Sequence, residues 1–280
     1  GGVVTGLPEL ADLGLSAAAT DTLHRAHALR LARTLDLPDD VVGESLPLTW
    51  IWVFFSPSVP SRGLRRDGHP AGADDGPLAG LDRRMFVGGS LECSGSIRLD
   101  EAIARASGIV SADVKEGSSG QFVIVDVEHR YTQRDEVVLV ERQNLMYRRQ
   151  PTGSVPAPGP AVEPPESLAR TTVVPDERLL FRYSALTFNT HRIHYDLPYA
   201  TSVEHYPGLV VHGPLTATLL AQLAADHLGR ALSRFEFRAT TPTFAGTPLH
   251  VVVDSATDSE ADLRAVRGDG AVVMTARARA

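Results

Sequence analysis

Cysteine and lysine are almost missing from this chain of 280 residues, since Cys93 is the only cysteine and Lys115 the only lysine. A single thiol forms no internal disulfide and cannot build a cysteine zinc cluster, so we expect Cys93 to be buried and inert. The other basic residues are arginines, no basic patch stands out, and the net charge is -7. Nucleic acid is therefore not expected as a partner.

Long apolar runs and several common enzyme motifs are also missing. The apolar segment TWIWVFFS is far too short to cross a membrane, so no membrane partner is expected. The opening GGVVTGLPEL lacks a signal-peptide pattern, and we expect a cytoplasmic protein. The sequence contains no G-x-x-x-x-G-K-[ST] phosphate loop and no G-x-S-x-G serine motif. Hydrophobic residues nevertheless make up 43% of the chain, enough for a full core.

A proline-rich segment divides the chain. Residues 151–170 lie in the run QPTGSVPAPGPAVEPPESLAR, which has no hydrophobic period and is typical of an extended linker. We therefore predict two domains, 1–150 and 171–280, each of ordinary size. Both halves have the same outline, a helix followed by a series of strands.

Hydrophobic spacing predicts the elements of each half. Helices are expected over 17–35, after a capping Asp176, and over 214–228. A stretch rich in proline and glycine covers 56–82. Strands are expected at 89–99, 121–132, 136–147, 233–241, 247–257, 261–267 and 271–279.

The predicted helix 214–228 is apolar on nearly all sides and must be buried on most of them. An antiparallel sheet curled around the helix would bury it. A doubly wound parallel sheet needs helices between its strands, and the last 50 residues leave no room for them. The predicted fold is therefore α+β, a double hot-dog in which each antiparallel sheet wraps around a long helix.

The segment FNTHRIHYDLPYA gathers chemically active side chains on a short loop. His194 is suited to proton transfer at neutral pH, Asn189 can fix a water or a carbonyl, and His191 can orient a partner or act as a second base. Asp196 either sets a histidine tautomer or caps the next turn. Ahead of a buried helix, this group indicates a catalytic site, and the alternative is a set of surface or satisfied core residues.

The segment VVHGPLTATLL places a glycine at the start of the apolar helix. Pro214 suits the first helical turn, and Gly213 is then at the cap, with its amide at the positive end of the helix dipole. Such an amide can stabilise an oxyanion on a thioester carbonyl, and glycine lets a ligand approach closely. The alternative is a helix start that needs glycine only for its turn.

A metal site is a second chemical interpretation. His194 and Asp196 form a His-x-Asp pair, which non-haem iron oxygenases use together with a distant histidine. His205, His212 or His250 would supply the third ligand. Those enzymes usually carry the pair on a strand of a β-barrel, whereas this segment is loop-like, so no metal is expected.

The stretches RYSALTFNTHRIHYDLPYA and YPGLVVHGPL resemble the MaoC-like, or R-specific, enoyl-thioester hydratase/dehydratase superfamily. WIWVFFSPSVPSRGLRRDGHP and RRMFVGGSLECSGSIRL are similar to the N-terminal hot-dog of one branch. That branch includes mesaconyl-C4-CoA and itaconyl-CoA hydratases and mitochondrial 3-hydroxyacyl-thioester dehydratases. The resemblance covers most of the chain.

The superfamily motif, roughly Ser-Gly-Asp-x-Asn-Pro-Leu-His-x-Asp, implies roles for individual residues. The catalytic histidine falls on His194 and the glycine of the oxyanion hole on Gly213. The catalytic aspartate falls on Asn189 and the motif's asparagine on His191, a variation that the branch shares as TFNxHRIHYD. The motif therefore does not decide which histidine activates water. The residues predicted to bind the substrate are Tyr195, Asp196, His212 and Pro214.

The activity implied by the resemblance is reversible hydration of a 2-enoyl thioester of coenzyme A or an acyl carrier protein. It implies no metal and no redox cofactor. We expect one active site per chain, in the second half, while the first half is non-catalytic and shapes the acyl tunnel with the 56–82 loop at its mouth. A homodimer is possible, although one chain already supplies paired hot-dogs. The arginines of GLRRDG and LDRRMF are either solvated or meet a coenzyme A phosphate.

Three alternatives keep the same fold. The enzyme would add an amine such as an amino acid to the enoyl thioester, or hydrolyse the thioester, because the same oxyanion hole serves all of these reactions. A third possibility is a binding or structural protein that has lost its chemistry. The presence of both His194 and Gly213 argues against that third possibility.

Overall fold

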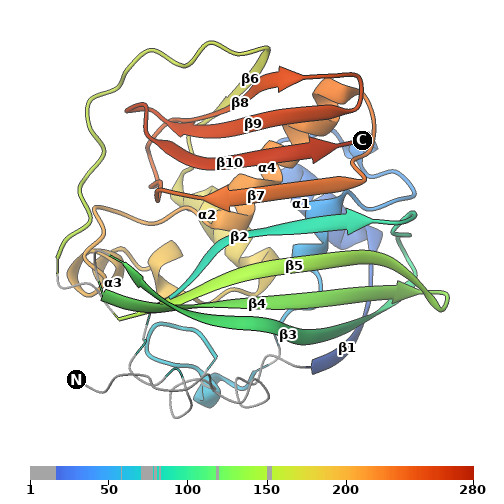
Figure 1. Ribbon diagram of the computed structural model, residues 1–280, viewed down its shortest axis with the longest axis horizontal. Helices are drawn as coiled ribbons and strands as arrows, with labels where there is room; N and C mark the ends of the chain where they lie inside the picture. The colour runs from blue at the N-terminus through green and yellow to red at the C-terminus, as the bar shows by residue number, and fades with distance from the viewer. Residues whose placement is uncertain are drawn as a thin grey trace.

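The computed structural model describes residues 17–57, 59–70, 78, 81, 83–117, 120–149 and 153–280. In this part of the chain ten strands form one antiparallel sheet in the order β1-β3-β4-β5-β2-β7-β10-β9-β8-β6 (Figure 1). The strands are β1 Ala17–Thr22, β2 Arg83–Cys93, β3 Ala102–Gly117, β4 Gly120–Gln133, β5 Glu136–Arg148, β6 Ala169–Val173, β7 Arg234–Ala239, β8 Leu249–Ala256, β9 Glu260–Arg267 and β10 Val272–Arg279.

The strand order repeats between the two halves of the chain. The first half contributes β1-β3-β4-β5-β2, and the second half contributes β6-β8-β9-β10-β7 in the corresponding order. The halves join where β2 pairs with β7, and there Leu91 lies opposite Phe235, both completely buried. This repeated arrangement confirms the predicted double hot-dog. Residues 153–168, which precede β6, form no helix or strand, and the exact domain limits stay a prediction.

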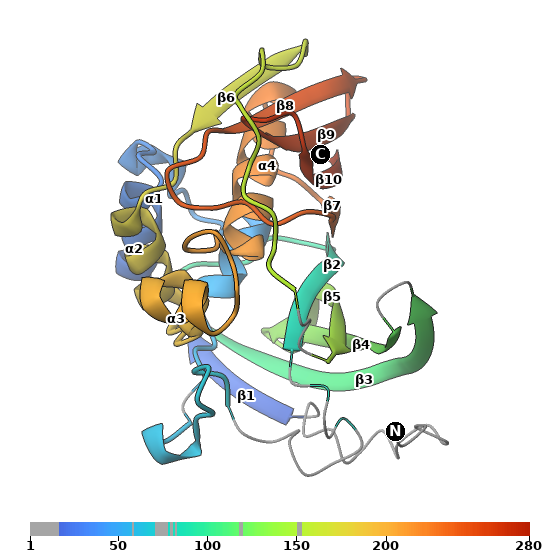
Figure 2. The same ribbon diagram turned by 90° about the vertical axis from the view of Figure 1, so that its left-hand side faces the viewer.

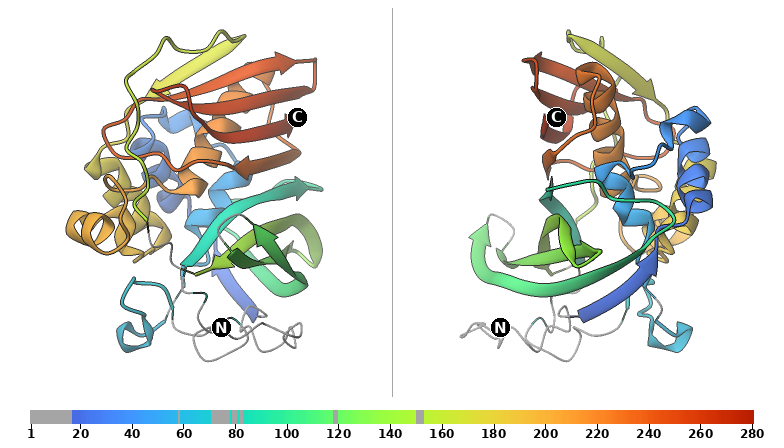
Figure 3. Two further views of the ribbon diagram at one scale, coloured as in Figure 1. Left: turned by 60° about the vertical axis from the view of Figure 1, so that its left-hand side comes forward. Right: turned by 90° about the vertical axis from the view of Figure 1, so that its right-hand side faces the viewer.

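The helices lie on one side of the sheet in two layers (Figure 2). α4 Gly213–Leu228 packs directly on β8, β9 and β10, while α1 Arg25–Thr34 and α2 Glu177–Thr187 pack together outside it. Figure 3 shows α4, in orange, between the red strands of the second half and the blue α1. The shorter elements are α3 Leu197–Ser202 and the 3-10 turns η2 Asp39–Val41, η3 Leu48–Val53, η4 Ser61–Gly63 and η5 Arg192–His194.

The long apolar helix forms where the sequence predicts it. Pro214 occupies its first turn, and Gly229 ends it with a φ of 65°, a conformation that glycine adopts without strain. His212 is the N-cap, so Gly213 is the first helical residue and not the cap. The buried side chains of this helix are Leu215, Thr216, Ala217, Thr218, Leu220, Ala221 and Ala224.

The first half departs from the prediction of a long helix in each repeat. The segment predicted to be a helix over 17–35 begins with β1, and α1 has only ten residues. Pairing with β3 along all of β1 outweighs the helix propensity of its alanines. The turn η3 packs against α4 instead, and its Trp50 and Ile51 are each 1% exposed.

Besides β1, two further strands were not predicted, and one strand was misplaced. β2 ends at Cys93, whereas the prediction ran over 89–99. β3 escaped notice because its side chains are mostly small or charged and because a bulge between Ile109 and Ser111 breaks its alternation. β6 is only five residues long and begins within the predicted linker. The predicted strands that correspond to β4, β5 and β7 to β10 are confirmed within a few residues.

The longest helix in the described residues, α4, has 16 residues. Within that part of the chain, no helix combines the length and the hydropathy that a membrane span requires.

Truncating a buried side chain of α4 tests whether this helix lies in the core. Leu220 is fully buried, so Leu220→Ala is expected to lower the free energy of unfolding by about 2–5 kcal/mol, measured by urea denaturation. Leu168 is 61% exposed, and Leu168→Ala is the matched control with an expected change within about 0.5 kcal/mol. Equal effects of the two variants would contradict the central position of α4.

Candidate active site

A cavity of about 1780 Å³ is lined by residues from both halves of the chain. The predicted catalytic residues His194 and Gly213 both line it. Asn189, His191, His212 and Pro214 line it as well. The first half contributes side chains that include Trp52 and Phe86, and part of the predicted mouth loop, from Val59 to Pro70. The cavity exceeds the usual range of about 300–1,000 Å³ and suits an extended ligand.

The histidine loop is held between α2 and the segment that enters α4. Asp176 caps α2 by accepting a hydrogen bond from the Leu179 amide at 2.8 Å, as the sequence predicted. The helix ends at Thr187 with Phe188 as its C-cap, and the chain then turns into η5, whose last residue is His194. The amide of Val210 donates to the Ile193 carbonyl at 2.9 Å, which ties this turn to the entry of α4.

The protonation of His194 is fixed by a backbone carbonyl. Its Nδ1 lies 2.7 Å from the oxygen of Val210, and because a carbonyl only accepts, Nδ1 carries the proton and Nε2 keeps its lone pair. The side chain is 7% exposed. Burial lowers the pKa of His194 to about 4; the Val210 bond opposes this change and His69 adds to it. His194 is therefore a neutral base above about pH 4.

A second histidine forms the floor beneath His194. The ring of His212 stacks on that of His194 with centroids 3.7 Å apart and planes 18° apart. Nε2 of His212 lies 2.8 Å from Oγ of Ser184 on α2, and its Nδ1 has no hydrogen-bond partner among the described residues. Burial, followed by the charge of His194, holds the pKa of His212 well below its usual range. Sequence reasoning missed Ser184, because nothing in the sequence links this helix position to a residue 28 positions later.

His191 and Asn189 form a wall of the site. His191 lies edge-on to His194 with ring centroids 5.4 Å apart. Oδ1 of Asn189 accepts a hydrogen bond from the backbone N–H of His191 at 3.0 Å. The side-chain carbonyl of Asn189 therefore stabilises the loop, and its amide nitrogen is left to donate hydrogen bonds. Burial lowers the pKa of His191 well below its usual range, and the neighbouring charges of His69, His194, His212 and Arg84 lower it further.

Asp196 has a structural position. Its Oδ1 accepts from the Tyr199 amide at 3.0 Å and caps α3, while its Oδ2 accepts from Nη2 of Arg192 at 2.7 Å. Of the two predicted roles, the turn cap is the one formed, since Val210 sets the tautomer of His194. Asp196 is not part of the described lining of the cavity, and the His-x-Asp pair is not among the described groups whose ligand atoms lie close enough to hold a metal ion.

Tyr195 also points away from the cavity. Its side chain is 46% exposed, and its hydroxyl donates to the Thr190 carbonyl at 3.0 Å. Among the residues predicted to bind the substrate, His212 and Pro214 line the cavity, whereas Tyr195 and Asp196 are not part of its described lining. The 3-10 turn over Arg192–His194 explains why Tyr195 and Asp196 lie outside the lining, because it directs neighbouring side chains to different sides of the loop.

Gly213 leaves its helix N-terminus open. A Cβ built on Gly213 would meet Phe86 at 3.8 Å, an ordinary contact, so packing within the chain does not require glycine there. At Gly89, by comparison, a Cβ would lie 2.3 Å from the Arg142 carbonyl. The free space beside Gly213 belongs to the cavity, where the amides of the first helical turn attract a partial negative charge.

Two functional candidates from the first half were not foreseen, because the run GLRRDG was expected to be solvated or to bind phosphate. Nδ1 of His69 lies 3.2 Å from Oδ2 of Asp67, and the ring of His69 lies 4.0 Å from that of His191. Both Asp67 and His69 line the cavity. The DGHP turn was the only available signal, since the contact joins residues 122 positions apart in sequence.

Asp67, His69 and His191 are also the group best placed to hold a metal ion in the described structure. Their ligand atoms all lie within 4.8 Å of one another. Zinc bonds of about 2.0–2.2 Å separate two ligand atoms by no more than about 4.4 Å, so this group would have to contract around an ion. The Asp67 carboxylate is also already bonded to His69.

The cavity carries an excess of positive charge, although the chain as a whole is acidic. Arg83 of LDRRMF is only 9% exposed and stacks over the ring of Tyr206 at 4.7 Å. Burial lowers the pKa of Arg83, and Glu204 opposes this effect. The basic side chains that line the cavity are Arg83, Arg84, Arg105, Lys115, Arg142, Arg148 and Arg238, against Asp67, Asp126, Glu204 and Glu236.

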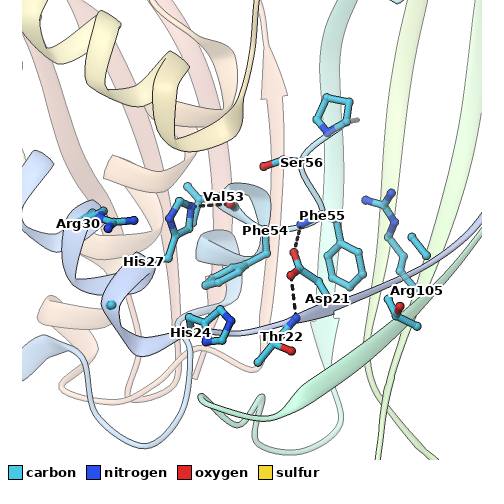
Figure 4. Close-up of a pocket in the computed structure, with 14 residues that line it drawn as sticks. Asp21, Thr22, His24, His27, Arg30, Val53, Phe54, Phe55, Ser56 and Arg105 are labelled. Atoms are coloured by element: carbon cyan, nitrogen blue, oxygen red, sulfur yellow. Dashed lines mark hydrogen bonds between the residues drawn. The ribbon is translucent and has the colours of Figure 1, made fainter. Parts of the chain in front are cut away.

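A second cavity, of about 770 Å³, lies beside β1 and α1 (Figure 4). Its polar groups mostly hold the chain together. Asp21 accepts from the amides of Thr22 and Phe55, each at 2.7 Å, and Nε2 of His27 lies 2.8 Å from the Val53 carbonyl. None of the predicted catalytic residues lines this cavity, so the larger cavity is the candidate active site.

The three neutral histidines of the site predict how stability depends on pH. The pKa values of His191, His194 and His212 are all lowered, so below pH 6.5 the unfolded chain binds protons that the folded chain excludes. Their contribution to stability is complete above pH 6.5 and is lost as the pH falls towards 4. Each fully excluded proton is worth about 1.4 kcal/mol per pH unit.

Urea denaturation between pH 8 and pH 4.5 measures this dependence. His194→Gln is expected to flatten the slope, whereas His227→Gln, at an exposed position of α4, should leave it unchanged. A slope in His194→Gln equal to that of the unmodified chain would show that His194 does not exclude a proton.

Known proteins resemble this chain over most of its length. The model of the family described as hydroxyacyl-thioester dehydratase type 2 matches residues 49–245. Mesaconyl-C(4)-CoA hydratase of Chloroflexus aurantiacus is 40% identical over 270 residues, which are 95% of this chain and 96% of that protein. The mitochondrial hydroxyacyl-thioester dehydratase type 2 of Saccharomyces cerevisiae is 25% identical over 239 residues, 81% of this chain and 84% of that protein.

Solved structures share the fold at low sequence identity. A MaoC-like dehydratase from Phytophthora capsici matches with a TM-score of 0.71 and 13% identity over 97% of both chains. A Mycobacterium tuberculosis protein described as having a double hotdog fold matches with a TM-score of 0.56 and 14% identity, again over 97% of both chains. These structures show the fold alone. The family model and the Chloroflexus relative show more: the chain belongs to the hydroxyacyl-thioester dehydratase type 2 family.

Proposed function

We propose that this protein catalyses the reversible addition of water to a 2-enoyl thioester, which gives the 3-hydroxyacyl thioester. One observation carries the proposal: the imidazole of His194, with a free lone pair on Nε2, and the amide end of α4 at Gly213 line the same cavity. The relatives named above as a hydratase and a dehydratase support the same reaction class.

The thioester carbonyl is the group that the Gly213 amide would bind. Hydrogen bonding to the carbonyl oxygen draws electrons from the conjugated double bond, so C3 becomes electrophilic and C2 can accept a proton. The negative charge that develops on this oxygen is stabilised by the amide and the positive end of the α4 dipole.

His194 then handles the proton of the attacking water. Nε2 takes a proton as the water oxygen bonds to C3, and the electron pair of the double bond moves onto the thioester oxygen as an enolate. The enolate collapses as C2 takes the proton back from His194. Burial disfavours the imidazolium and drives this return. Asn189 and His191 would hold the water, and dehydration runs through the same steps in reverse.

A carrier with phosphate groups fits the charge of the cavity. Coenzyme A and acyl carrier protein both present the acyl group on a phosphorylated arm, and arginine binds phosphate through paired donors. Arg83 and Arg84 are candidates for this contact because both line the cavity. The proposed steps use neither a metal nor a redox cofactor, so activity is expected to survive treatment with EDTA.

Products distinguish hydration from the alternatives that share its oxyanion hole. Crotonyl-CoA is incubated with the protein, with and without glycine, and the products are read by mass spectrometry. Gain of one water supports the proposal. Gain of glycine would identify an amine-adding enzyme, free coenzyme A would identify a thioesterase, and binding without turnover over a panel of enoyl thioesters would identify a binding protein.

Removing the proposed base should abolish most turnover. His194→Ala is expected to lower kcat by at least ~100-fold, the usual contribution of a general base. His227→Ala is the matched control and should keep the activity of the unmodified enzyme, since this side chain is exposed at the far end of α4. Near-normal turnover of His194→Ala, with a native circular dichroism spectrum, would remove this residue from the mechanism.

Adding one methyl group at the oxyanion site tests the role of Gly213. Gly213→Ala should fold normally, because the new Cβ has 3.8 Å to its nearest neighbour. It should lower kcat/KM at least about tenfold by holding the carbonyl away from the amide, since catalysis is sensitive to ~1 Å misplacement. Gly43→Ala, where a Cβ meets nothing within 4 Å, is the control. Unchanged kcat/KM in Gly213→Ala would mean that the carbonyl binds elsewhere.

A further inference from the structure

We propose that Asp67 and His69, which come from the first half of the chain, form the second acid/base pair of this active site. His69 would exchange a proton with the reacting groups, and Asp67 would position it. The inference rests on the proposed hydratase reaction and changes the expectation that the first half is non-catalytic.

The turn that carries this pair is docked on the histidine loop. Oγ1 of Thr190 donates to the carbonyl of Gly68 at 2.6 Å, and the amide of Arg192 donates to the carbonyl of Asp67 at 2.9 Å. Gly68 has a φ of 94°, and a Cβ there would lie 1.8 Å from the Thr190 oxygen. Only glycine permits this approach, so the two segments form one unit although they belong to different halves.

The pair is oriented like a carboxylate–histidine dyad. Asp67 accepts the backbone N–H of His69 at 2.9 Å through Oδ1 and faces Nδ1 of the same ring at 3.2 Å through Oδ2. Since an ionised carboxylate only accepts, Nδ1 carries a proton, and Nε2 is the atom that exchanges one. The side chains of Asp67 and His69 are 12% and 20% exposed, so the pair is partly shielded from water.

Asp67 remains ionised in this setting. Burial acts to raise the pKa of its carboxyl group, but the hydrogen bonds from His69 and the positive charge of Arg65, 3.8 Å away, outweigh burial and leave the pKa below its usual value. Among the described residues, the titratable and charged groups near His69 include Asp67, Arg65, His191 and His194. A fixed negative charge therefore stands behind His69.

The histidine loop needs such a charge. The superfamily motif has an aspartate where this chain has Asn189, and the other acidic residue of the loop, Asp196, is engaged by Arg192. Within residues 188–196 there is thus no carboxylate that lines the cavity. Asp67 supplies one from outside the loop, through a histidine whose ring lies 4.0 Å from His191.

Two histidines account for every proton that the hydration reaction moves. In hydration, His194 takes a proton from water as the C3–O bond forms. Protonated His69, in place of His194, then gives its proton to C2 as the enolate collapses. His194 then releases its proton to solvent water, and the Nε2 atom of His69 takes one up from solvent. Both histidines return to their starting states, and one molecule of water has been added.

Glutamine in place of His69 tests the proton transfer. His69→Gln keeps the approximate size of the side chain and is expected to lower kcat at least ~100-fold on crotonyl-CoA, with KM changed only a few-fold. It should also remove one limb of the pH profile of kcat, which a purely structural residue would not do. His227→Gln is the control and should match the unmodified enzyme.

Restoring the carboxylate of the motif gives a sharper test. Asn189→Asp keeps an oxygen for the His191 amide and places an acid beside the histidines. The double variant Asn189→Asp with His69→Gln should regain at least about tenfold in kcat over His69→Gln alone, because the superfamily's own acid would then replace the pair. Asp67→Asn, which removes the charge at constant shape, should lower kcat and be rescued in the same way.

The outcomes separate this inference from the proposed function. If the unmodified enzyme hydrates crotonyl-CoA while both His69→Gln and Asp67→Asn stay within about threefold of its kcat, the inference is wrong and the hydratase proposal stands. Loss of activity without a change in the pH profile and without rescue by Asn189→Asp also overturns it. If the unmodified enzyme yields no hydrated product, the proposed function itself fails. Should His69→Gln not fold, the near-isosteric Asp67→Asn decides alone.

Discussion

The hydrogen bond from His194 to the Val210 carbonyl is the interaction on which the active site depends. It fixes the tautomer of the imidazole and so decides which nitrogen keeps a lone pair. Val210 also lies only three residues before Gly213. A single short segment therefore holds the proposed base through one carbonyl and starts the helix whose first amide is the proposed oxyanion donor.

The repeated fold explains why this site occurs in one half and faces the other. In the second half, α4 lies between β6 and β7 in sequence. In the first half, the described residues of the corresponding stretch between β1 and β2 contain α1, three 3-10 turns and the loop that carries Asp67 and His69. The described part of this stretch has no helix as long as α4, and first-half residues such as Trp52 and Phe86 line a cavity against the start of α4. The second half carries the histidine loop, and the first half provides walls, charge and the docked turn.

The parts of this arrangement that are local in sequence could be predicted. The all-round apolar character of 214–228, the capping Asp176 and the alternation of the last four strands each reflect neighbours in the chain, and each was identified. Residues that depend on distant partners could not be placed. Ala17–Thr22 became a strand only through pairing with β3, Ser184 meets His212 across 28 positions, and His69 meets His191 across 122. For Asp196, local spacing was not enough to predict the role. Its spacing from His194 permitted several roles, and only its contacts with Arg192 and Tyr199 selected one.

The protonation state of His194 is the quantity that tests this account most directly. Nitrogen-15 NMR of the protein labelled at histidine, with the His194 signals assigned by their loss in His194→Gln, reports which ring nitrogen carries the proton. The account predicts a neutral imidazole with the proton on Nδ1 throughout pH 5.5 to 8, because burial lowers the pKa to about 4. A proton on Nε2, or a ring that titrates near 6.5, would contradict it.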